Sequence, residues 1–163
     1  MGNLQLVRVW RIVRERHVAE PFSGEGSRRF PGRWNSRGLP LAYSSEHLSL
    51  AAIELFVHVV EEDEPGDLMA IEAEIAIDAK TIARQQSDVL KRLKADWRFD
   101  VGATRAMGDE WFAARESLVM LVPSVVIEVE WNVLINPQHA DFAGLKVVQT
   151  RPFRFDERMF KAK

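Results

Sequence analysis

The sequence predicts a single domain of the α+β class. Its 163 residues match the size of one domain and are enough to bury a core without disulfides. About six short strand-like segments and three or four helical segments can be recognised, with the strands concentrated late in the chain. This mixture is typical of the α+β class.

The first strand is predicted over residues 5–13, which are rich in β-branched and aromatic side chains. Arg8 and Arg11 interrupt this run, so we expect the strand to be partly exposed. Residues 14–40 contain four glycines and three prolines, which predicts a long loop with almost no regular structure. Loops of this length in small domains are usually functional or disordered, and three aromatic residues in this one favour an ordered loop.

A short strand is expected over residues 41–43 and a helix over residues 45–60. Ser45 is a suitable N-cap, and Glu46 is favourable at the positive end of a helix. The helix is apolar on nearly all sides, which predicts burial.

The rest of the chain continues the same mixture. Residues 68–77 alternate strictly and indicate a half-buried strand. The remaining predictions are one or two helices within 79–98, a helix over 103–115, strands over 117–122 and 125–130 separated by Pro123, and one or two strands within 145–155.

Composition excludes several classes of function. The net charge of -2 lacks the basic excess of most nucleic-acid-binding proteins. The absence of cysteine excludes disulfides, thiol catalysis and cysteine metal sites, and the four histidines lack metal-ligand spacing. There is no signal-peptide pattern and no apolar run that could span a membrane, so we expect a cytoplasmic protein.

Three candidate site residues occur within residues 32–54. Arg33 follows Gly32 and offers a planar fork for phosphate or carboxylate groups. Tyr43, the only tyrosine, could stack on a planar ring. Glu54 is a carboxylate among apolar helical neighbours, which is costly unless it is paired or hydrogen-bonded. Together they suit an anionic, aromatic, sugar-bearing ligand.

Each candidate also has a purely structural interpretation. Glu54 could form a buried ion pair with an arginine or with His58. Arg33 could pair with Glu54 or stack on Trp34, and Tyr43 could be an ordinary core side chain.

Two serines are weaker candidates. Ser117 and Ser124 flank a predicted strand and could hydrogen-bond a ligand. For a lone serine, however, a structural role is the more common one.

Two stretches of the chain resemble the RES domain. They are GRWNSRGLPLAYSSEHLSLAAIELFVH (residues 32–58) and LVMLVPSVVIEVEWNVLINPQHADF (residues 118–142). The resemblance covers nearly the whole chain, and the motif-bearing part runs from about residue 10 to 155. It implies one RES domain over residues 1–163, with an ADP-ribosyltransferase-like fold of short mixed or antiparallel sheets flanked by helices.

The resemblance also implies an activity and residues that carry it. RES proteins are toxins of Res–Xre toxin–antitoxin operons that consume NAD. By this resemblance Glu54, Arg33 and Tyr43 are catalytic, and Arg33 and Tyr43 also bind NAD. Ser117 is the expected site serine, with Ser124 as its rival.

Several alternatives stay open on the sequence alone. The acceptor for ADP-ribose could be water, phosphate or a protein, the last making the chain a mono-ADP-ribosyltransferase. A different class of function is a non-catalytic ligand-binding module. The resemblance implies no metal and no permanently bound cofactor, since NAD is the substrate. It also implies an Xre-like helix-turn-helix antitoxin that blocks the NAD cleft. Direct contact with nucleic acid is not expected, and self-association within the complex stays open.

Overall fold

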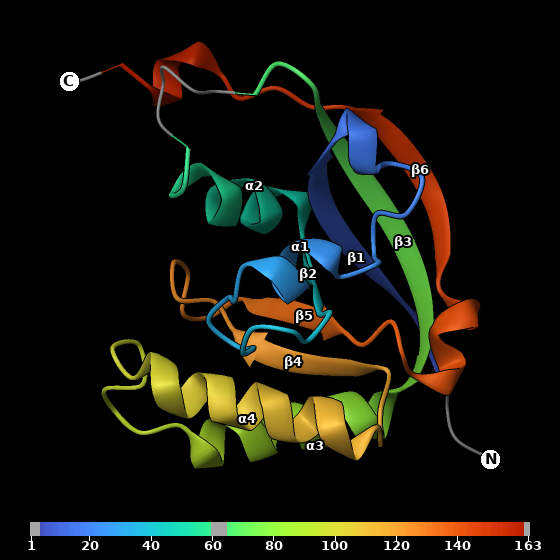
Figure 1. Cartoon of the computed structure of the whole chain (residues 1–163), viewed down its shortest axis with the longest axis vertical. Helices are drawn as coiled ribbons and strands as arrows, with labels where there is room; N and C mark the ends of the chain where they lie inside the picture. Colours follow the sequence, from blue (N-terminus) through green and yellow to red (C-terminus); the bar gives the residue numbers. More distant parts are fainter. Residues whose placement is uncertain (1–3, 60–64, 162–163) are drawn as a thin grey trace.

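One six-stranded sheet organises the chain in the computed structural model, which describes residues 4–59 and 65–161 (Figure 1). The strands are β1 (Leu4–Arg14), β2 (Ala42–Ser45), β3 (Leu68–Asp78), β4 (Val119–Pro123), β5 (Trp131–Ile135) and β6 (Lys146–Pro152). Their order is β4-β5-β2-β1-β3-β6, and every neighbouring pair is antiparallel. The α-helices are α1 (Glu25–Arg29), α2 (Leu48–Phe56), α3 (Ala79–Arg92) and α4 (Val101–Ala114). Short 3-10 turns are Glu15–His17, Ala140–Gly144 and Glu157–Met159.

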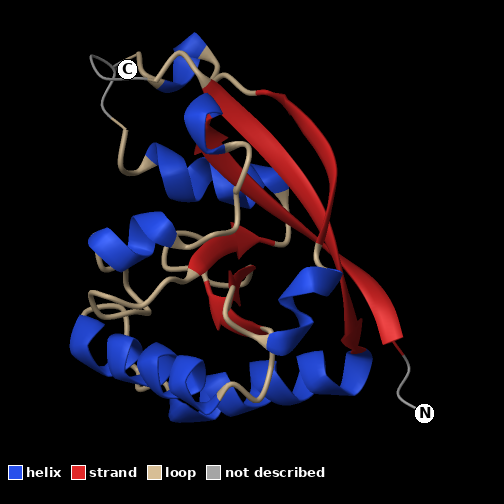
Figure 2. Ribbon diagram, turned by 45° about the vertical axis from the view of Figure 1, so that its right-hand side comes forward, coloured by secondary structure: helices blue, strands red, loops and turns tan. Residues whose placement is uncertain are grey.

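The sheet consists of two unequal halves that meet at a narrow junction. β1 and β3 pair along eleven residues each, and β6 continues that half on the far side of β3. The other half, β2, β5 and β4, has strands of only four or five residues. Within the described residues, one register pair, Trp10 with Ser45, joins β1 to β2. The long strands sweep away from the short ones in Figure 2, so the sheet opens between β1 and β2.

Two apolar clusters form the core. One joins the two halves, because it contains Val9, Ile71 and Ile75 of the long strands together with Val133 of β5. The other lies between the short strands and the helices α3 and α4, which run side by side beneath β4 in Figure 1. Trp34 belongs to this second cluster, so the loop before β2 is anchored in the core. The prediction of an ordered loop is thereby confirmed, but residues 14–40 hold more regular structure than predicted, namely α1 and the first 3-10 turn.

The α+β class and the total of six strands are confirmed, but the identity of one strand is wrong: β5 (Trp131–Ile135) was not predicted to be a strand. The sheet is single and antiparallel, which is one of the two expected arrangements, and β1 and β3 form close to their predicted bounds. Residues 125–130 form a turn instead of a strand. The Ser124 hydroxyl accepts hydrogen bonds from the backbone N–H groups of Val126 and Ile127, which closes the chain into that turn. Strand propensity is overridden here by local side-chain bonding.

The helix that carries Glu54 also differs from its prediction over residues 45–60. It begins at Leu48 because Ser45 ends β2, so Ser45 is not the N-cap; residue 60 lies outside the described part. Only Leu50 and Ala51 are buried in α2. Its other apolar residues stay partly accessible because the helix borders a cavity. Among the described helices, none has the length and hydropathy needed to cross a bilayer.

Candidate active site

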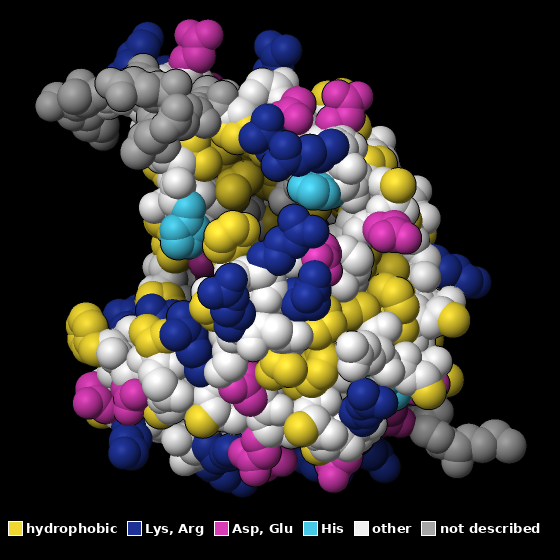
Figure 3. All heavy atoms as spheres, in the orientation of Figure 1, with side chains coloured by type: hydrophobic (Ala, Val, Ile, Leu, Met, Phe, Trp, Pro, Cys, Tyr) yellow, Lys and Arg dark blue, Asp and Glu magenta, His cyan; other side chains and the backbone are white. Residues whose placement is uncertain are grey.

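A cavity of about 930 Å³ lies where the sheet opens. Its walls come from the facing parts of β1 and β2, from α2, from the loop that precedes β2 and from the start of α4. Figure 3 shows the surface hollowed on this face, with basic side chains beside the hollow. A volume near 1,000 Å³ is at the upper end of small-molecule sites, which fits a large ligand such as a dinucleotide.

Asn35 fixes the loop that forms one wall. Its side chain is fully buried, and Oδ1 accepts hydrogen bonds from the Gly32 backbone N–H at 3.0 Å and the Tyr43 hydroxyl at 2.7 Å. Nδ2 donates to the backbone carbonyls of Ser27, Ser36 and Leu39. Asn35 therefore has a structural role that its position in the sequence did not reveal.

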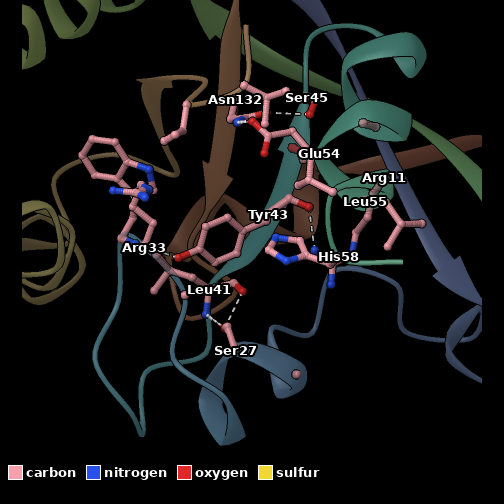
Figure 4. A pocket seen from close by; sticks show the side chains of 18 of the residues that line it. Arg11, Ser27, Arg33, Leu41, Tyr43, Ser45, Glu54, Leu55, His58 and Asn132 are labelled. Atoms are coloured by element: carbon pink, nitrogen blue, oxygen red, sulfur yellow. Dashed lines mark hydrogen bonds between the residues drawn. The ribbon is translucent and has the colours of Figure 1, made fainter. Parts of the chain in front are cut away.

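Tyr43 lies across the middle of the cavity, between Arg33 and Arg11 in Figure 4. Its hydroxyl also accepts a hydrogen bond from the Trp34 backbone N–H at 3.1 Å. A methyl group at Gly32 would lie 2.5 Å from the tyrosine oxygen, so only glycine lets the loop come this close. The hydroxyl is thus held by two hydrogen bonds while the side chain lines the cavity, which is the placement that a stacking surface requires.

The Tyr43 hydroxyl should resist ionisation. Burial, the main cause, raises the pKa of Tyr43 from 10.0 to about 12. Because this chain has one tyrosine, its phenolate absorbance can be followed without interference from others. We expect a midpoint near pH 12 in the folded protein and near pH 10 in denaturant. Between these values stability should fall as pH rises, since the unfolded chain releases the proton first. A folded midpoint near 10 would contradict a buried hydroxyl.

Arg33 is held by α4 and the loop before it. Its Nη1 donates to the Arg98 carbonyl at 2.7 Å, and its own carbonyl accepts from the Thr104 hydroxyl at 2.8 Å. Arg105 Nε donates to the Gly32 carbonyl at 2.8 Å. In the described part of the chain, Arg33 has no carboxylate within 4.0 Å, so it does not pair with Glu54.

Arg11 occupies the floor of the cavity at the narrow junction. Its Nη1 donates to the Tyr43 carbonyl at 2.5 Å, so a side chain bridges β1 and β2 where backbone pairing has stopped. Burial lowers the pKa of Arg11 to about 10, which leaves the guanidinium charged at neutral pH. From the sequence, Arg11 was expected only to make the strand partly exposed. Its presence within an otherwise apolar strand was the one signal that it could belong to a site.

The cavity carries excess positive charge. Arg11, Arg33 and Arg105 line it, and Glu54 is the only carboxylate among the described residues that do. Ion pairs between described residues involve none of these three arginines. Such a wall favours an anionic ligand with more than one negative charge.

Glu54 points from α2 into the cavity (Figure 4). Oε1 accepts a hydrogen bond from Asn132 Nδ2 at 2.5 Å, and Asn132 Oδ1 accepts from the Ser45 hydroxyl at 2.6 Å. Within the described chain, Glu54 forms no ion pair with an arginine or with His58. One carboxylate oxygen, Oε1, is therefore hydrogen-bonded to the Asn132 amide. The other oxygen, Oε2, has no hydrogen bond to any described residue.

The structure brings Arg33, Tyr43 and Glu54 together but leaves the two predicted serines outside the cavity lining. The Ser117 hydroxyl bonds to Trp111, Gln85 and the Val119 carbonyl. Ser124 is fully buried, and its hydroxyl closes the turn after β4. Both hydroxyls are used internally, which argues against the expectation that they bind NAD.

Sequence reasoning missed Ser45 and Asn132, which line the cavity beside Glu54. The available signals were weak. Ser45 was interpreted as a helix cap, and Asn132 is a polar residue within an otherwise apolar run. Only their cross-strand pairing reveals that they act together.

Comparison with known proteins now gives the family. The RES domain matches residues 8–156, which is most of the chain.

The chain belongs to the RES-domain family.

The chain is 34% identical over 160 residues to a protein of Photorhabdus laumondii named Toxin Res, covering 95% of this chain and 98% of that one. It is 29% identical over 156 residues to the Prs ADP-ribosylating toxin of a Sphingobium species, covering 93% and 96%. The prediction of a RES toxin from the two motifs is confirmed at the level of the family.

A solved structure supports the fold of this RES domain. The crystal structure of the M. tuberculosis MbcT–MbcA toxin–antitoxin complex contains a chain that superposes with a TM-score of 0.67. The match covers 91% of the present chain and 84% of the other, with 20% sequence identity. At this identity the likeness concerns the fold, which agrees with the predicted α+β class.

Proposed function

We propose that this RES toxin breaks the bond between nicotinamide and ribose in NAD. The observation that carries the proposal is the arrangement of Glu54, Tyr43 and three arginines around one cavity. The arginines complement a diphosphate, the tyrosine ring offers a surface for a planar base, and the carboxylate lies where a ribose could meet it. NAD combines these three chemical features in one molecule.

The residues suggest how the bond breaks. Loss of nicotinamide leaves positive charge on the ribose, as in glycoside hydrolysis. Glu54 would stabilise that charge and accept a hydrogen bond from a ribose hydroxyl. The leaving group needs no strong acid because its pyridinium nitrogen is already cationic. A site that supplies no acid agrees with the state of the Tyr43 hydroxyl, which stays protonated and donates its hydrogen bond to Asn35.

The decisive experiment measures NAD after expression of the chain alone and after incubation of the purified protein with labelled NAD. We expect loss of NAD and release of nicotinamide. A purely ligand-binding module would leave NAD intact in both experiments, and this result would overturn the proposal.

A second candidate is transfer of ADP-ribose to a protein. It is favoured by the relative from Sphingobium, which is named an ADP-ribosylating toxin. Incubation with labelled NAD, with and without phosphate and cell lysate, separates the two. Label on protein supports transfer, whereas ADP-ribose or its phosphate supports consumption of free NAD.

We also propose an antitoxin partner, of the Xre-like helix-turn-helix type, that covers the cavity. The fold match to one chain of a toxin–antitoxin complex motivates this proposal. A small helix-turn-helix gene beside the toxin gene should encode it. Co-expression should restore cellular NAD, and the two proteins should purify together; failure of both would contradict the partner.

Replacement of Arg33 by Lys should weaken the use of NAD. The arginine donates to the Arg98 carbonyl and still has N–H groups for a diphosphate, whereas lysine has one point charge and cannot form a fork. We expect kcat/KM for NAD to fall by about tenfold, most of it through KM, since a charge-assisted bond contributes about 1.5–3 kcal/mol.

Arg37→Lys is the matched control for this change. Arg37 lies in the same loop, is exposed and does not line the cavity, so its replacement should leave KM unchanged. Equal effects of the two variants would show that Arg33 has no specific contact with NAD.

A further inference from the structure

Ser45, Asn132 and Glu54 form a hydrogen-bonded chain across three elements. Ser45 ends β2, Asn132 lies directly opposite it on β5, and Glu54 comes from α2. The distances are 2.6 Å from the Ser45 hydroxyl to Asn132 Oδ1 and 2.5 Å from Asn132 Nδ2 to Glu54 Oε1. Figure 4 shows the three side chains converging at one side of the cavity.

The serine determines which way the amide faces. An asparagine side chain has one accepting and one donating end, and a carboxylate only accepts. Because the Ser45 hydroxyl donates to Oδ1, the Nδ2 end is turned toward Glu54. Ser45 is 3% exposed, so water has little access to compete for this bond. Without the hydroxyl, the amide would lose the contact that selects its orientation.

The amide in turn determines where the carboxylate lies. Oε1 of Glu54 is held by a short, charge-assisted hydrogen bond, which is stronger than a neutral one. Glu54 lies in the last turns of α2, where residues 52–56 are all only partly buried, so packing alone does not fix its side chain. The bond to Asn132 therefore sets the position of the second oxygen, Oε2.

We propose that Ser45 and Asn132 are positioning residues, which hold Glu54 so that Oε2 stays free for the substrate ribose. This inference rests on the proposed NAD cleavage for its functional meaning. Neither residue needs to touch the substrate for this role. The serine that supports the reaction is then Ser45 on β2, beside the Glu54 carboxylate, and not Ser117 or Ser124 at the ends of β4.

Ser45→Ala tests the role, and Ser44→Ala is its matched control. Ser44 is also buried on β2, and its hydroxyl donates to the Val133 carbonyl of β5 at 2.7 Å, so both variants lose one hydrogen bond between the same strands. We expect Ser45→Ala to lower kcat by about tenfold with KM within about twofold, and Ser44→Ala to leave kcat near that of the wild type. Ser45→Thr, which keeps a hydroxyl, should restore most of kcat.

A double-mutant cycle shows whether Ser45 acts through Glu54. In a Glu54→Gln background, Ser45→Ala should cause no further loss of kcat, because the group it positions is gone. A full additional loss in that background, or equal kcat loss from Ser44→Ala and Ser45→Ala, would overturn the proposal.

A measurement without turnover separates this inference from the proposed function. The side-chain amide protons of Asn132 should resonate downfield in the wild type and in Ser44→Ala by NMR, and lose that shift in Ser45→Ala. If NAD is not cleaved but these shifts behave as expected, the proposed function fails while the positioning holds. Unchanged Asn132 resonances in Ser45→Ala would remove the positioning role.

Discussion

Replacement of Glu54 by Gln is expected to slow NAD cleavage by about a hundredfold, the typical cost of losing one electrostatic contact to a transition state. The amide is nearly the same size and can still accept a hydrogen bond from Asn132, so the cavity keeps its shape. What is lost is the negative charge opposite the ribose as nicotinamide departs. The effect should appear in kcat, because this contact strengthens as charge develops. It is measured by nicotinamide release from NAD.

Glu46→Gln is the control for this substitution. Glu46 lies eight residues earlier, accepts a hydrogen bond from the Trp131 backbone N–H at 2.9 Å, and is not part of the cavity lining. Its replacement keeps an acceptor and should leave NAD cleavage unchanged. If Glu54→Gln consumed NAD as fast as the wild type, the carboxylate would have no part in the reaction.

Replacement of Gly108 by Ala should strongly destabilise the contact between α4 and the loop that forms one wall of the cavity. A methyl group at this position on α4 would lie 1.8 Å from the Trp34 carbonyl oxygen and 2.8 Å from its carbonyl carbon. Backbone atoms cannot move aside as the end of a flexible side chain can. Either α4 or the loop that contains Trp34 must therefore shift. We expect a loss of about 3 kcal/mol in the free energy of unfolding, the upper range for overpacking. The midpoint of urea denaturation measures it.

Gly102→Ala supplies the comparison on the same helix. Its methyl group would meet only the Asp100 carboxylate, at 3.6 Å, and alanine favours a helix over glycine by about 1 kcal/mol. This variant should be neutral or slightly more stable. If both variants behaved alike, the close approach of α4 to the Trp34 loop would be refuted.

Much of the fold is predictable because it depends on local pattern. The strict alternation over residues 68–77 predicted β3, and the β-branched run over residues 5–13 predicted β1. The failures have local and tertiary causes. Residues 125–130 have strand composition, but the Ser124 hydroxyl binds two of their backbone N–H groups. The helix α2 looked buried from its composition, yet it borders a cavity that composition does not reveal.

The candidate site divides in the same way. Arg33, Tyr43 and Glu54 lie within one stretch of chain and were found from their chemistry and from the resemblance of that stretch to the RES domain. Ser45 and Asn132 are 87 residues apart and become neighbours only through the pairing of β2 with β5. Ser117 is favoured by the sequence because it opens the strand that leads into the second motif, and Ser124 lies within that motif, but both hydroxyls form hydrogen bonds inside the structure.

The sequence by itself determined the α+β class, the family and the stretch that carries the arginine, tyrosine and glutamate. These follow from residue type and short-range spacing, which do not depend on long-range contacts. Only the tertiary structure decided that the sheet opens between β1 and β2 and that Arg11 enters the cavity there. It also decided that Ser45 is the serine linked to Glu54, through Asn132. The physical reason is that strand pairing sets which distant side chains meet, and one register pair at that junction leaves room for a ligand.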